Sequence, residues 1–321
     1  MILASLAIHG GAGTIPRANF TPESYQAARD GLRDALRAGW AVLSTGGLAV
    51  DAVEAAVIAL ENHPSFNAGH GAVLNAGGDH ELDAAIMDGR DRRAGAIAAA
   101  RAIRNPIRAA RRVMEASDCV LLSAGGADAF AREQGLEMVE QSYFTTPLRQ
   151  QHWLRAQEEK AGLLKRERSE AEKHGTVGAV ASDDAGNLAA ATSTGGYTYK
   201  RVGRVGDTPI IGAGTYACNG VVAVSCTGMG EFFIRRGTSH DIAARIRYRG
   251  ESLADATAAA IADLTEDGCG AGLIAIDANG TIVLPHNTEG MYRGSVTADG
   301  VFSVGIYADD FQHLAIGSTG L

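Results

Sequence analysis

The residues with the clearest chemical potential are Gly175 and Thr176, which separate a charged segment from an apolar run. Residues 149–174 are rich in charge and lack apolar periodicity, whereas residues 177–181 (VGAVA) have the composition of a buried strand. Cleavage between Gly175 and Thr176 would place a new α-amino group beside the Thr176 hydroxyl. A threonine hydroxyl needs an adjacent base to act as a nucleophile, and an α-amino group with a pKa of about 7.7–8.0 suits that task. A Gly-Thr pair before a strand is more often a simple loop ending, so other residues must support this interpretation.

Two further segments place hydroxyls and glycines at the ends of apolar runs. They are Thr192-Ser193-Thr194-Gly195-Gly196 and Thr227-Gly228-Met229-Gly230-Glu231. Such strand ends supply hydroxyl and backbone N–H donors for an oxyanion. Arg204 and Asp207 lie between them, three residues apart. The ordinary interpretation of this pair is a salt bridge within a loop. The alternative is a clamp for an amino acid, with Arg204 on the α-carboxylate and Asp207 on the α-ammonium.

Other motifs are weaker. Residues 212–217 (GAGTYA) fit a dinucleotide-binding pattern with Glu231 downstream, but a strand-like run at 221–226 follows where that motif needs a helix. His9-Gly10-Gly11 resembles the oxyanion loop of lipases, yet the chain has no Gly-x-Ser-x-Gly elbow. His63, His70, His80 and Glu81 lie close together in sequence but lack the helical spacing of a zinc site, so we interpret the histidines as scattered surface side chains.

Composition limits the classes of function. The net charge of −8 favours neither nucleic acid nor an anionic membrane as a partner. The four cysteines have no metal-site or redox spacing, which predicts reduced, mostly buried thiols and a cytoplasmic location. Residues 1–8 are apolar without a basic flank, so we expect a first strand and not a signal peptide.

Apolar periodicity predicts blocks of helices between groups of antiparallel strands. Helices are expected at 23–43, 51–62 with Asp51 as N-cap, 107–116, 127–134, 231–236, 242–247 and 253–264. Strands are expected at 6–9, 81–87, 120–123, 177–181, 188–192, 221–226, 273–277, 281–284 and 301–307. This order predicts an α+β fold with helices outside two stacked sheets. Residues 149–175 are expected to be a flexible linker inside one domain, residues 1–321, because strands on both sides need partners from the other half.

Several sequence blocks, in order along the chain, resemble one family. They are His9-Gly10-Gly11-Ala12-Gly13, Phe66-Asn67-Ala68-Gly69, Glu81-Leu82-Asp83-Ala84, Met87-Asp88-Gly89, Arg104-Asn105-Pro106, Gly175-Thr176-Val177-Gly178, residues 187–196 (NLAAATSTGG), Gly203-Arg204-Val205-Gly206-Asp207, Ser225-Cys226-Thr227-Gly228 and residues 287–291 (NTEGM). With these blocks the chain resembles the plant-type L-asparaginases, also called isoaspartyl peptidases, of the threonine-type N-terminal nucleophile hydrolases.

The resemblance implies a four-layer αββα sandwich that cleaves itself between Gly175 and Thr176. The products would be an α subunit, residues 1–175, and a β subunit, residues 176–321. Two such α/β heterodimers would associate into a heterotetramer. The implied activity is hydrolysis of β-aspartyl dipeptides and of the side-chain amide of L-asparagine through a β-aspartyl-enzyme intermediate.

The resemblance also implies a role for each matching residue. Thr176 would be the nucleophile and its own amino group the base, with Thr194 bracing its hydroxyl and Asn67 orienting its amino group. Thr227 and Gly228 would hold the oxyanion and the substrate amide, and Arg204 and Asp207 would form the clamp. No cofactor is implied for catalysis. A structural sodium ion would be held by the backbone carbonyls of Leu60, Glu61, His63, Phe66, Ala68 and His70, since carbonyl oxygens suit a hard cation.

Two alternatives stay open. One is the related glycosylasparaginases, which are typically exported and disulfide-bonded, unlike the expectation for this chain. The other is a catalytically silent protein that keeps only the aspartate pocket. Tyr197 and Tyr199 add bulky rings that we expect near the pocket rim, where they would affect the size of the leaving group.

Overall fold

The computed structural model describes residues 4–163 and 175–315, and within them two β-sheets carry the functional loops. The larger sheet has the strand order β13-β12-β11-β1-β5-β6-β2-β3-β4. Its strands are β1 (Ser5–Gly13), β2 (Leu82–Asp88), β3 (Ala94–Ala100), β4 (Leu121–Ser123), β5 (Val177–Ser182), β6 (Leu188–Thr194), β11 (Gly290–Val296), β12 (Val301–Gly305) and β13 (Gln312–Ala315). Neighbouring strands are antiparallel except for the parallel pair β3 and β4.

The smaller sheet has the order β10-β9-β8-β7 and packs against the larger one. Its strands are β7 (Thr215–Cys218), β8 (Val222–Gly228), β9 (Ala271–Asp277) and β10 (Ile282–Val283). Small and branched side chains such as Val180, Ala190, Ala223 and Ile274 fill one apolar cluster contributed by both sheets. Strands β5 and β6, which follow Thr176 in the chain, therefore lie directly against β8.

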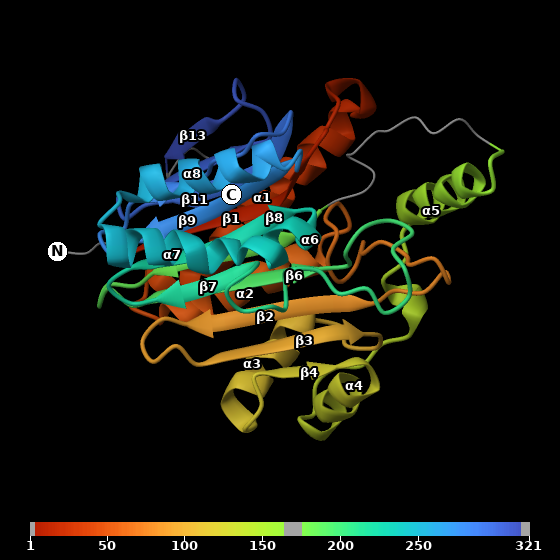
Figure 1. Cartoon of the computed structure of the whole chain (residues 1–321), viewed down its shortest axis with the longest axis horizontal. Coiled ribbons are helices and arrows are strands. Elements are labelled where there is room, and N and C mark those ends of the chain that lie inside the picture. Colours follow the sequence, from red (N-terminus) through yellow and green to blue (C-terminus); the bar gives the residue numbers. More distant parts are fainter. Residues whose placement is uncertain (1–3, 164–174, 316–321) are drawn as a thin grey trace.

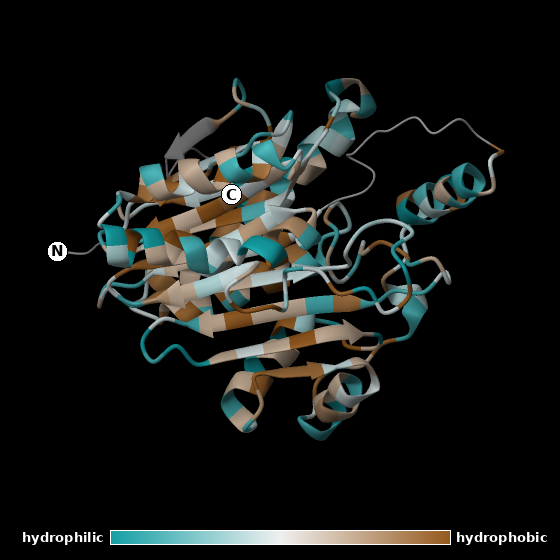
Figure 2. Cartoon of the chain, in the orientation of Figure 1, coloured by the Kyte–Doolittle hydropathy of each residue, from teal (hydrophilic) through white to brown (hydrophobic). Residues whose placement is uncertain are grey.

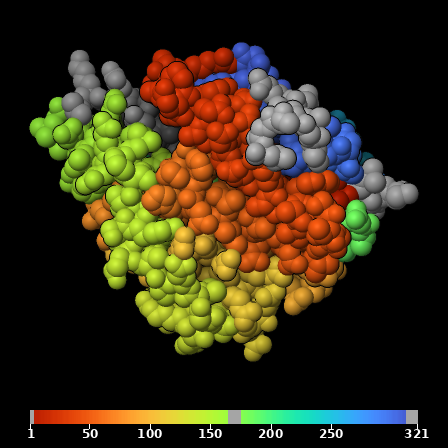
Figure 3. All heavy atoms as spheres, turned by 180° about the vertical axis from the view of Figure 1, so that it is seen from behind, coloured from red at the N-terminus to blue at the C-terminus, as the bar shows by residue number. Residues whose placement is uncertain are grey.

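Helices cover the outer face of each sheet (Figure 1). Helices α1 (Pro22–Leu43), α2 (Ala49–Asn62) and α3 (Pro106–Ala116) pack on the larger sheet, while α7 (Thr238–Arg249) and α8 (Leu253–Glu266) pack on the smaller one. The remaining helices are α4 (Ala124–Glu133), α5 (Pro147–Lys160) and α6 (Gly230–Arg236). In Figure 2 the strands are mostly brown, whereas teal gathers on the helices, as expected when helices face water and strands are buried. From behind, the red and orange atoms of the first two helices form much of the surface (Figure 3).

The structure confirms the predicted α+β class and most of the predicted elements. Helix α2 differs at its start, because Leu48 is the N-cap and Asp51 lies in the first turn. The carboxylate of Asp183, far away in sequence, accepts the N–H of Ala49 at 3.2 Å and thereby caps this helix. Sequence periodicity cannot reveal a cap supplied from another element.

The segment expected to be a flexible linker is partly helical. Helix α5 covers residues 147–160, with Pro147 in its first turn and the Thr146 side chain accepting the N–H of Arg149. The indole N–H of Trp153 donates to the Asn75 carbonyl at 2.8 Å, and its ring lies near that of Tyr199. Arg149 Nε also donates to the Gly71 carbonyl at 2.6 Å, so two side chains dock a helix whose polar sequence gave no periodic signal. Residues 164–174 of the expected linker lie outside the described residues.

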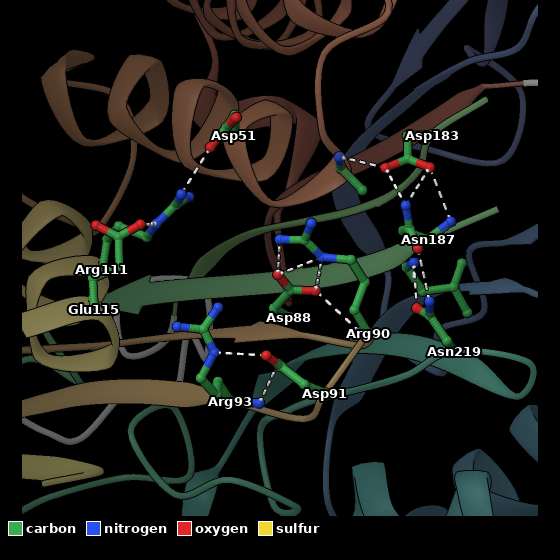
Figure 4. Close-up of polar contacts among 12 residues, drawn as sticks. Asp51, Asp88, Arg90, Asp91, Arg93, Arg111, Glu115, Asp183, Asn187 and Asn219 are labelled. Carbon is green, nitrogen blue, oxygen red and sulfur yellow. Dashed lines mark hydrogen bonds and ion pairs between the residues drawn. The ribbon is translucent and has the colours of Figure 1, made fainter. Parts of the chain in front are cut away.

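The register of β2 with β6 defines two opposite ends of the larger sheet. Asp83 lies opposite Thr194 at one end, and Asp88 lies opposite Ala189 at the other. The Asp88 end is closed by short turns whose side chains bond one another, including Asp183, Asn187 and Asn219 (Figure 4). The Thr194 end carries the predicted functional residues. Within the described residues, no helix has both the length and the apolar composition needed to cross a membrane.

Candidate active site

The peptide bond between Gly175 and Thr176 is buried at the Thr194 end of the sheet. The carbonyl oxygen of Gly175 accepts two hydrogen bonds, from Asn67 Nδ2 at 2.8 Å and from Thr194 Oγ1 at 3.0 Å. The Thr176 hydroxyl donates to Thr194 Oγ1 at 3.3 Å. The structure thus brings together Asn67, Thr194 and the predicted cleavage site. Two donors on one carbonyl oxygen, with a hydroxyl at the adjoining residue, can stabilise a tetrahedral oxyanion formed at Gly175.

Asn67 and Thr194 are held rigidly by the glycines beside Thr194. Asn67 Nδ2 also donates to the Gly196 carbonyl at 2.7 Å, and its Oδ1 accepts the N–H of Val73 at 2.9 Å. The N–H of Gly196 donates to Thr194 Oγ1 at 3.0 Å. A Cβ on Gly195 would lie 2.6 Å from Asn67 Oδ1, so only glycine permits this approach. The family resemblance implies that Asn67 orients the Thr176 amino group; in the uncut chain Asn67 instead bonds the Gly175 carbonyl of the Gly175–Thr176 peptide bond.

Strand β1 reaches the site through a bulge. The strand continues past His9 into the glycines, with a register shift between His9 and Gly11 against β11. Gly11 has φ +111°, and a Cβ there would lie 2.9 Å from the Gly175 Cα and 3.2 Å from the Thr176 nitrogen. The glycines that looked like a loop after the strand therefore allow its backbone to contact the Gly175–Thr176 bond.

His9 holds the backbone of Thr176 through a hydrogen bond. Its Nδ1 lies 2.9 Å from the Thr176 carbonyl oxygen, which requires an N–H at Nδ1, and its Nε2 then accepts from the Ser225 hydroxyl at 2.9 Å. The Ser225 hydroxyl is also hydrogen-bonded to the Thr192 hydroxyl at 2.7 Å, and the Thr215 hydroxyl donates to Thr192 at 2.6 Å. Burial lowers the pKa of His9 to about 3, against the effect of its bond to Thr176, so the ring is neutral. This hydroxyl chain ties both sheets to the predicted nucleophile.

Thr227 and Gly228 end strand β8 close to the same bond. Thr227 Oγ1 accepts the N–H of Ala12 at 3.3 Å, one residue beyond the glycine that touches Gly175. Gly228 has φ +152°, and a Cβ there would lie 2.7 Å from the Gly270 carbonyl oxygen. The predicted oxyanion residues are therefore close to the predicted nucleophile, Thr176.

The structure does not pair Arg204 with Asp207, so the ordinary salt-bridge interpretation is wrong. Arg204 instead donates from Nε and Nη2 to the two carboxylate oxygens of Glu231, at 2.9 and 2.8 Å, and lies over the Tyr197 ring. Its Nη1 makes no hydrogen bond to the described residues, which leaves donors for another carboxylate.

Asp207 is a buried carboxylate with one oxygen that can still accept a hydrogen bond. Its Oδ2 accepts no hydrogen bond from the described residues. A Cβ on Gly214 would lie 2.6 Å from Oδ2, and a Cβ on Gly230 would lie 2.7 Å from Oδ1, so two glycines make room for it. Burial raises the pKa of Asp207 to about 7, against the effects of its own N–H and of Arg204. An ammonium ligand would supply the missing hydrogen bond and charge.

Backbone hydrogen bonds hold together the loop that is expected to bind sodium. The N–H of His70 donates to the Glu61 carbonyl at 2.7 Å, and the N–H of Phe66 donates to the His63 carbonyl at 3.2 Å. The Glu61 carboxylate points elsewhere, since it accepts from Ser193, Asn105 and Ile107. Burial raises its pKa to about 7, opposed by those hydrogen bonds. The carbonyl oxygens of Glu61 and His63 therefore already accept backbone N–H groups, and a cation at this loop would use their second lone pairs.

Two sequence interpretations need correction here. His80 is buried, with hydrogen bonds to Val73 and Thr145, so it is not a surface side chain. Within the described ranges, no group of three or more His, Cys, Asp or Glu side chains could hold a metal ion. Tyr199 contacts Trp153, whereas Tyr197 supports Arg204, so only Tyr197 is placed at the clamp. The GAGTYA segment leads into strand β7 and not into a nucleotide-binding helix.

Sequence reasoning gave no role to several residues that the structure places here. His9, Ser225, Glu81 and Asp83 all belong to the blocks that carried the family resemblance, and this was their only signal. All four cysteines lie in the described residues, where they form no disulfide, and Cys119 is exposed.

Comparison with known sequences agrees with this geometry. The sequence profile described as asparaginase matches residues 2–306. An isoaspartyl peptidase of Salmonella typhimurium is 48% identical over 312 residues, covering 95% of this chain and 99% of the relative. An isoaspartyl peptidase of Escherichia coli is 48% identical over 310 residues, covering 95% and 97%. An isoaspartyl peptidase/L-asparaginase of Danio rerio is 42% identical over 282 residues, covering 87% and 88%.

The match along the chain to an asparaginase profile and to isoaspartyl peptidases shows that this protein is a hydrolase. The chain belongs to the asparaginase family.

Proposed function

We propose that this protein is an isoaspartyl peptidase with L-asparaginase activity, and that it activates itself by cleaving the Gly175–Thr176 bond. One observation carries the proposal: Asn67 and Thr194 both donate to the Gly175 carbonyl oxygen while the Thr176 hydroxyl lies beside Thr194. We infer further that the observed helix and sheet layers are the αββα sandwich of the N-terminal nucleophile hydrolases.

Self-cleavage follows from these contacts. Thr176 Oγ attacks the Gly175 carbonyl carbon, and Asn67 Nδ2 and the Thr194 hydroxyl hold the resulting oxyanion. The C–N bond then breaks, the Thr176 nitrogen takes the hydroxyl proton, and Gly175 is left as an ester on Oγ. Water hydrolyses this ester, which frees the carboxylate of Gly175 together with the amino group and hydroxyl of Thr176.

Turnover uses the same hydroxyl. The free amino group of Thr176 accepts its proton, and Oγ attacks the β-carbonyl carbon of the substrate. Thr227 and Gly228 stabilise the oxyanion, and ammonia or an amino acid leaves with the proton. Water then hydrolyses the β-aspartyl ester. Throughout, neutral His9 keeps the Thr176 carbonyl in place.

The clamp gives specificity for a free aspartyl unit. Asp207 Oδ2 accepts from the α-ammonium, and the remaining Arg204 donors bind the α-carboxylate while Glu231 fixes the guanidinium plane. An α-linked aspartyl peptide has no free α-carboxylate for Arg204, and a site that leaves a buried polar group unpaired rejects such an analogue strongly.

We also propose a sodium ion at the carbonyls of Leu60, Glu61, His63, Phe66, Ala68 and His70, where it would stabilise the loop that carries Asn67. Further, we propose a dimer of α/β heterodimers located in the cytoplasm. Light scattering of the purified protein tests the assembly.

The decisive test combines electrophoresis with two isomeric substrates. Purified protein is expected to give two bands, with the smaller one beginning at Thr176, and to release leucine from β-aspartyl-leucine but not from α-aspartyl-leucine. A single intact chain after days at neutral pH would indicate the silent binding protein. Hydrolysis of glycosylated asparagine in place of the dipeptide would indicate a glycosylasparaginase.

A further inference from the structure

Helix α5 is attached to the rest of the protein by polar side chains and not by an apolar face. In Figure 1 it stands apart from the helices that cover the two sheets, and none of its 14 described residues is buried. Arg149 Nε donates to the Gly71 carbonyl oxygen at 2.6 Å, and the indole N–H of Trp153 donates to the Asn75 carbonyl oxygen at 2.8 Å. Because Arg149 and Trp153 are four residues apart, they lie on the same face of the helix. This face therefore contacts two separate segments of the chain.

The Arg149 contact leads to the segment that carries Asn67. Gly71 lies within residues 67–73, where the N–H of Val73 donates to Asn67 Oδ1 at 2.9 Å. Asn67 Nδ2 in turn donates to the Gly175 carbonyl oxygen at 2.8 Å, at the predicted cleavage site. Arg149 thus holds the outer side of a short segment whose inner side stabilises the proposed oxyanion.

The Trp153 contact leads to the turn that precedes the substrate clamp. Asn75 forms a parallel bridge with Lys200, and the N–H of Ala76 donates to the Lys200 carbonyl oxygen at 2.7 Å. The Trp153 ring also lies against the Tyr199 ring, with the ring centroids 6.5 Å apart and the planes tilted by 35°. Trp153 therefore contacts both sides of this bridge.

The backbone of this turn is strained, and the turn is connected to Arg204. Tyr199 has φ +63°, a left-handed conformation that an aromatic residue keeps only where its surroundings enforce it. The N–H of Lys200 donates to the Tyr197 carbonyl oxygen at 3.1 Å, and the Tyr197 ring lies 4.7 Å from the guanidinium carbon of Arg204. A displacement of Tyr199 would therefore shift the ring that supports the arginine of the clamp.

We infer that helix α5 positions both halves of the active site, with Arg149 holding the Asn67 segment and Trp153 holding the turn at residues 197–200. The inference rests on the proposed function. Both side chains are positioning residues, since neither contacts Gly175, Thr176 or the clamp directly. Their hydrogen bonds do not involve the Gly175–Thr176 peptide bond, so the helix stays docked after cleavage. It then holds Tyr199 of the proposed β subunit from the end of the proposed α subunit.

The first test separates substrate binding from chemistry at the Trp153 contact. Trp153→Phe removes the N–H donor, and Trp153→Ala also removes the ring. We expect the KM for β-aspartyl-leucine to rise about threefold and about tenfold, respectively, with kcat within about twofold and self-cleavage at the wild-type rate. Leu154→Ala is the matched control, because Leu154 is exposed on the same helix and should leave KM unchanged.

The second test concerns self-cleavage at the Arg149 contact. Arg149→Met keeps the apolar stem but loses the bond to Gly71. We expect the uncut chain to disappear about tenfold more slowly, because Asn67 is held less firmly against the Gly175 carbonyl, while the KM of the cleaved fraction stays within about twofold of wild type. Gln150→Ala, at the next and exposed position, should cleave at the wild-type rate.

Hydrogen exchange gives a readout that does not depend on activity. Amides of residues 197–204 should exchange faster in Trp153→Ala, and those of residues 67–73 should exchange faster in Arg149→Met. Amides of residues 151–160 should be equally protected in cleaved wild-type protein and in uncut Thr176→Ala. A loss of this protection on cleavage would overturn the inference.

The kinetic outcomes are equally decisive. A Trp153→Ala enzyme with the wild-type KM, an Arg149→Met chain with the wild-type cleavage rate, or the same losses in the two controls would each overturn the inference. Should Trp153→Ala not fold, Trp153→Phe carries the first test. Wild-type protein that neither cleaves itself nor hydrolyses β-aspartyl-leucine would refute the proposed function, and exchange in the uncut variants would still decide whether α5 holds both segments.

Discussion

Asp183 and Asp207 are both buried carboxylates in loops that join strands, yet their surroundings differ. Asp183 accepts from the backbone N–H groups of Ala49, Ala185 and Asn187 and from the Asn187 side chain. Asp207 keeps one oxygen without a partner among the described residues, and burial raises its pKa to about 7. The first closes the end of the larger sheet drawn in Figure 4, and the second follows the end of β6 that carries Thr194 and lies against Gly214 and Gly230.

The same contrast holds for arginine. Arg90 donates from Nε and Nη2 to Asp88 two residues away, in a local turn. Arg204 binds Glu231 from a different element and keeps Nη1 unused by the described residues. One end of the sheet satisfies its polar groups internally, and the other leaves hydrogen-bonding capacity aimed at a ligand. Incomplete satisfaction at buried positions is costly to stability, so it marks a site that function maintains.

The largest expected effect is at the nucleophile. Thr176→Ala should leave one uncut and inactive chain, because no hydroxyl remains to attack the Gly175 carbonyl. Asn219→Ala at the opposite end should still give two bands. Electrophoresis after prolonged incubation at neutral pH checks both variants, and two bands from Thr176→Ala would refute the cleavage mechanism.

Substitution of the two arginines compares the ends directly. Arg204→Ala should lower kcat/KM for β-aspartyl-leucine by an amount that corresponds to about 2–5 kcal/mol of transition-state binding, since a charge-assisted contact to the α-carboxylate is lost. Self-cleavage should continue, because Arg204 makes no contact with Gly175. Arg90→Ala should keep kcat/KM within about twofold, as its ion pair is partly exposed. Steady-state kinetics of cleaved protein decide this, and an Arg204→Ala enzyme with wild-type kinetics would remove Arg204 from the clamp.

The two buried aspartates should respond to substitution with opposite signs. The pKa of Asp207 is higher in the folded chain, about 7, than the ordinary value of 3.8, so its ionisation costs stability as pH rises through this interval. Asp207→Asn should therefore raise the free energy of unfolding at pH 8 by about 2–4 kcal/mol, a gain that disappears toward pH 4. Asp183→Asn should lower it by about 1–3 kcal/mol, since charge-assisted bonds are lost.

Urea denaturation at pH 8 and pH 4 measures both changes. The Asp207→Asn enzyme should also lose turnover. One variant would then show that the Asp207 carboxylate supports activity while it lowers the stability of the fold. A destabilising Asp207→Asn substitution at pH 8 would show that this carboxylate has structural partners like those of Asp183.

Much of the fold was readable from periodicity because its helices are amphipathic and its strands are apolar runs between turn residues. Helix α5 was missed, since hydrogen bonds from Trp153 and Arg149 dock it and no apolar stripe marks it. Thr176, Arg204 and Asp207 are predicted from a hydroxyl, glycines and charges beside apolar runs, whereas the roles of Thr194 and Thr227 depend on the family resemblance. Glu231 as the partner of Arg204 could not be found, because 27 residues separate them and only the packing of α6 on the clamp joins them.

The buried residues that hold the site in place could not be predicted from the sequence either. His9, Ser225 and Thr215 come from three strands in two sheets, so their hydrogen-bond chain exists only after the sheets stack. A single histidine before glycines is compatible with many structures. Only the three-dimensional structure distinguishes a neutral histidine that bonds the backbone from a histidine that acts as a catalytic base.

The smallest expected effect concerns the leaving group. β-Aspartyl-leucine and L-asparagine present the same α-ammonium, α-carboxylate and β-carbonyl to the clamp, so Arg204 and Asp207 cannot distinguish them. The leucyl portion adds apolar contacts that ammonia lacks, which should favour the dipeptide in kcat/KM by about tenfold, a typical value for a modest apolar contact. Tyr199 does not oppose this, because its ring lies against Trp153, and Tyr197 is held beneath Arg204. Parallel assays of the two substrates measure the ratio. A clear preference for L-asparagine would mean that the leaving-group side is closed, with Tyr197 the first residue to replace.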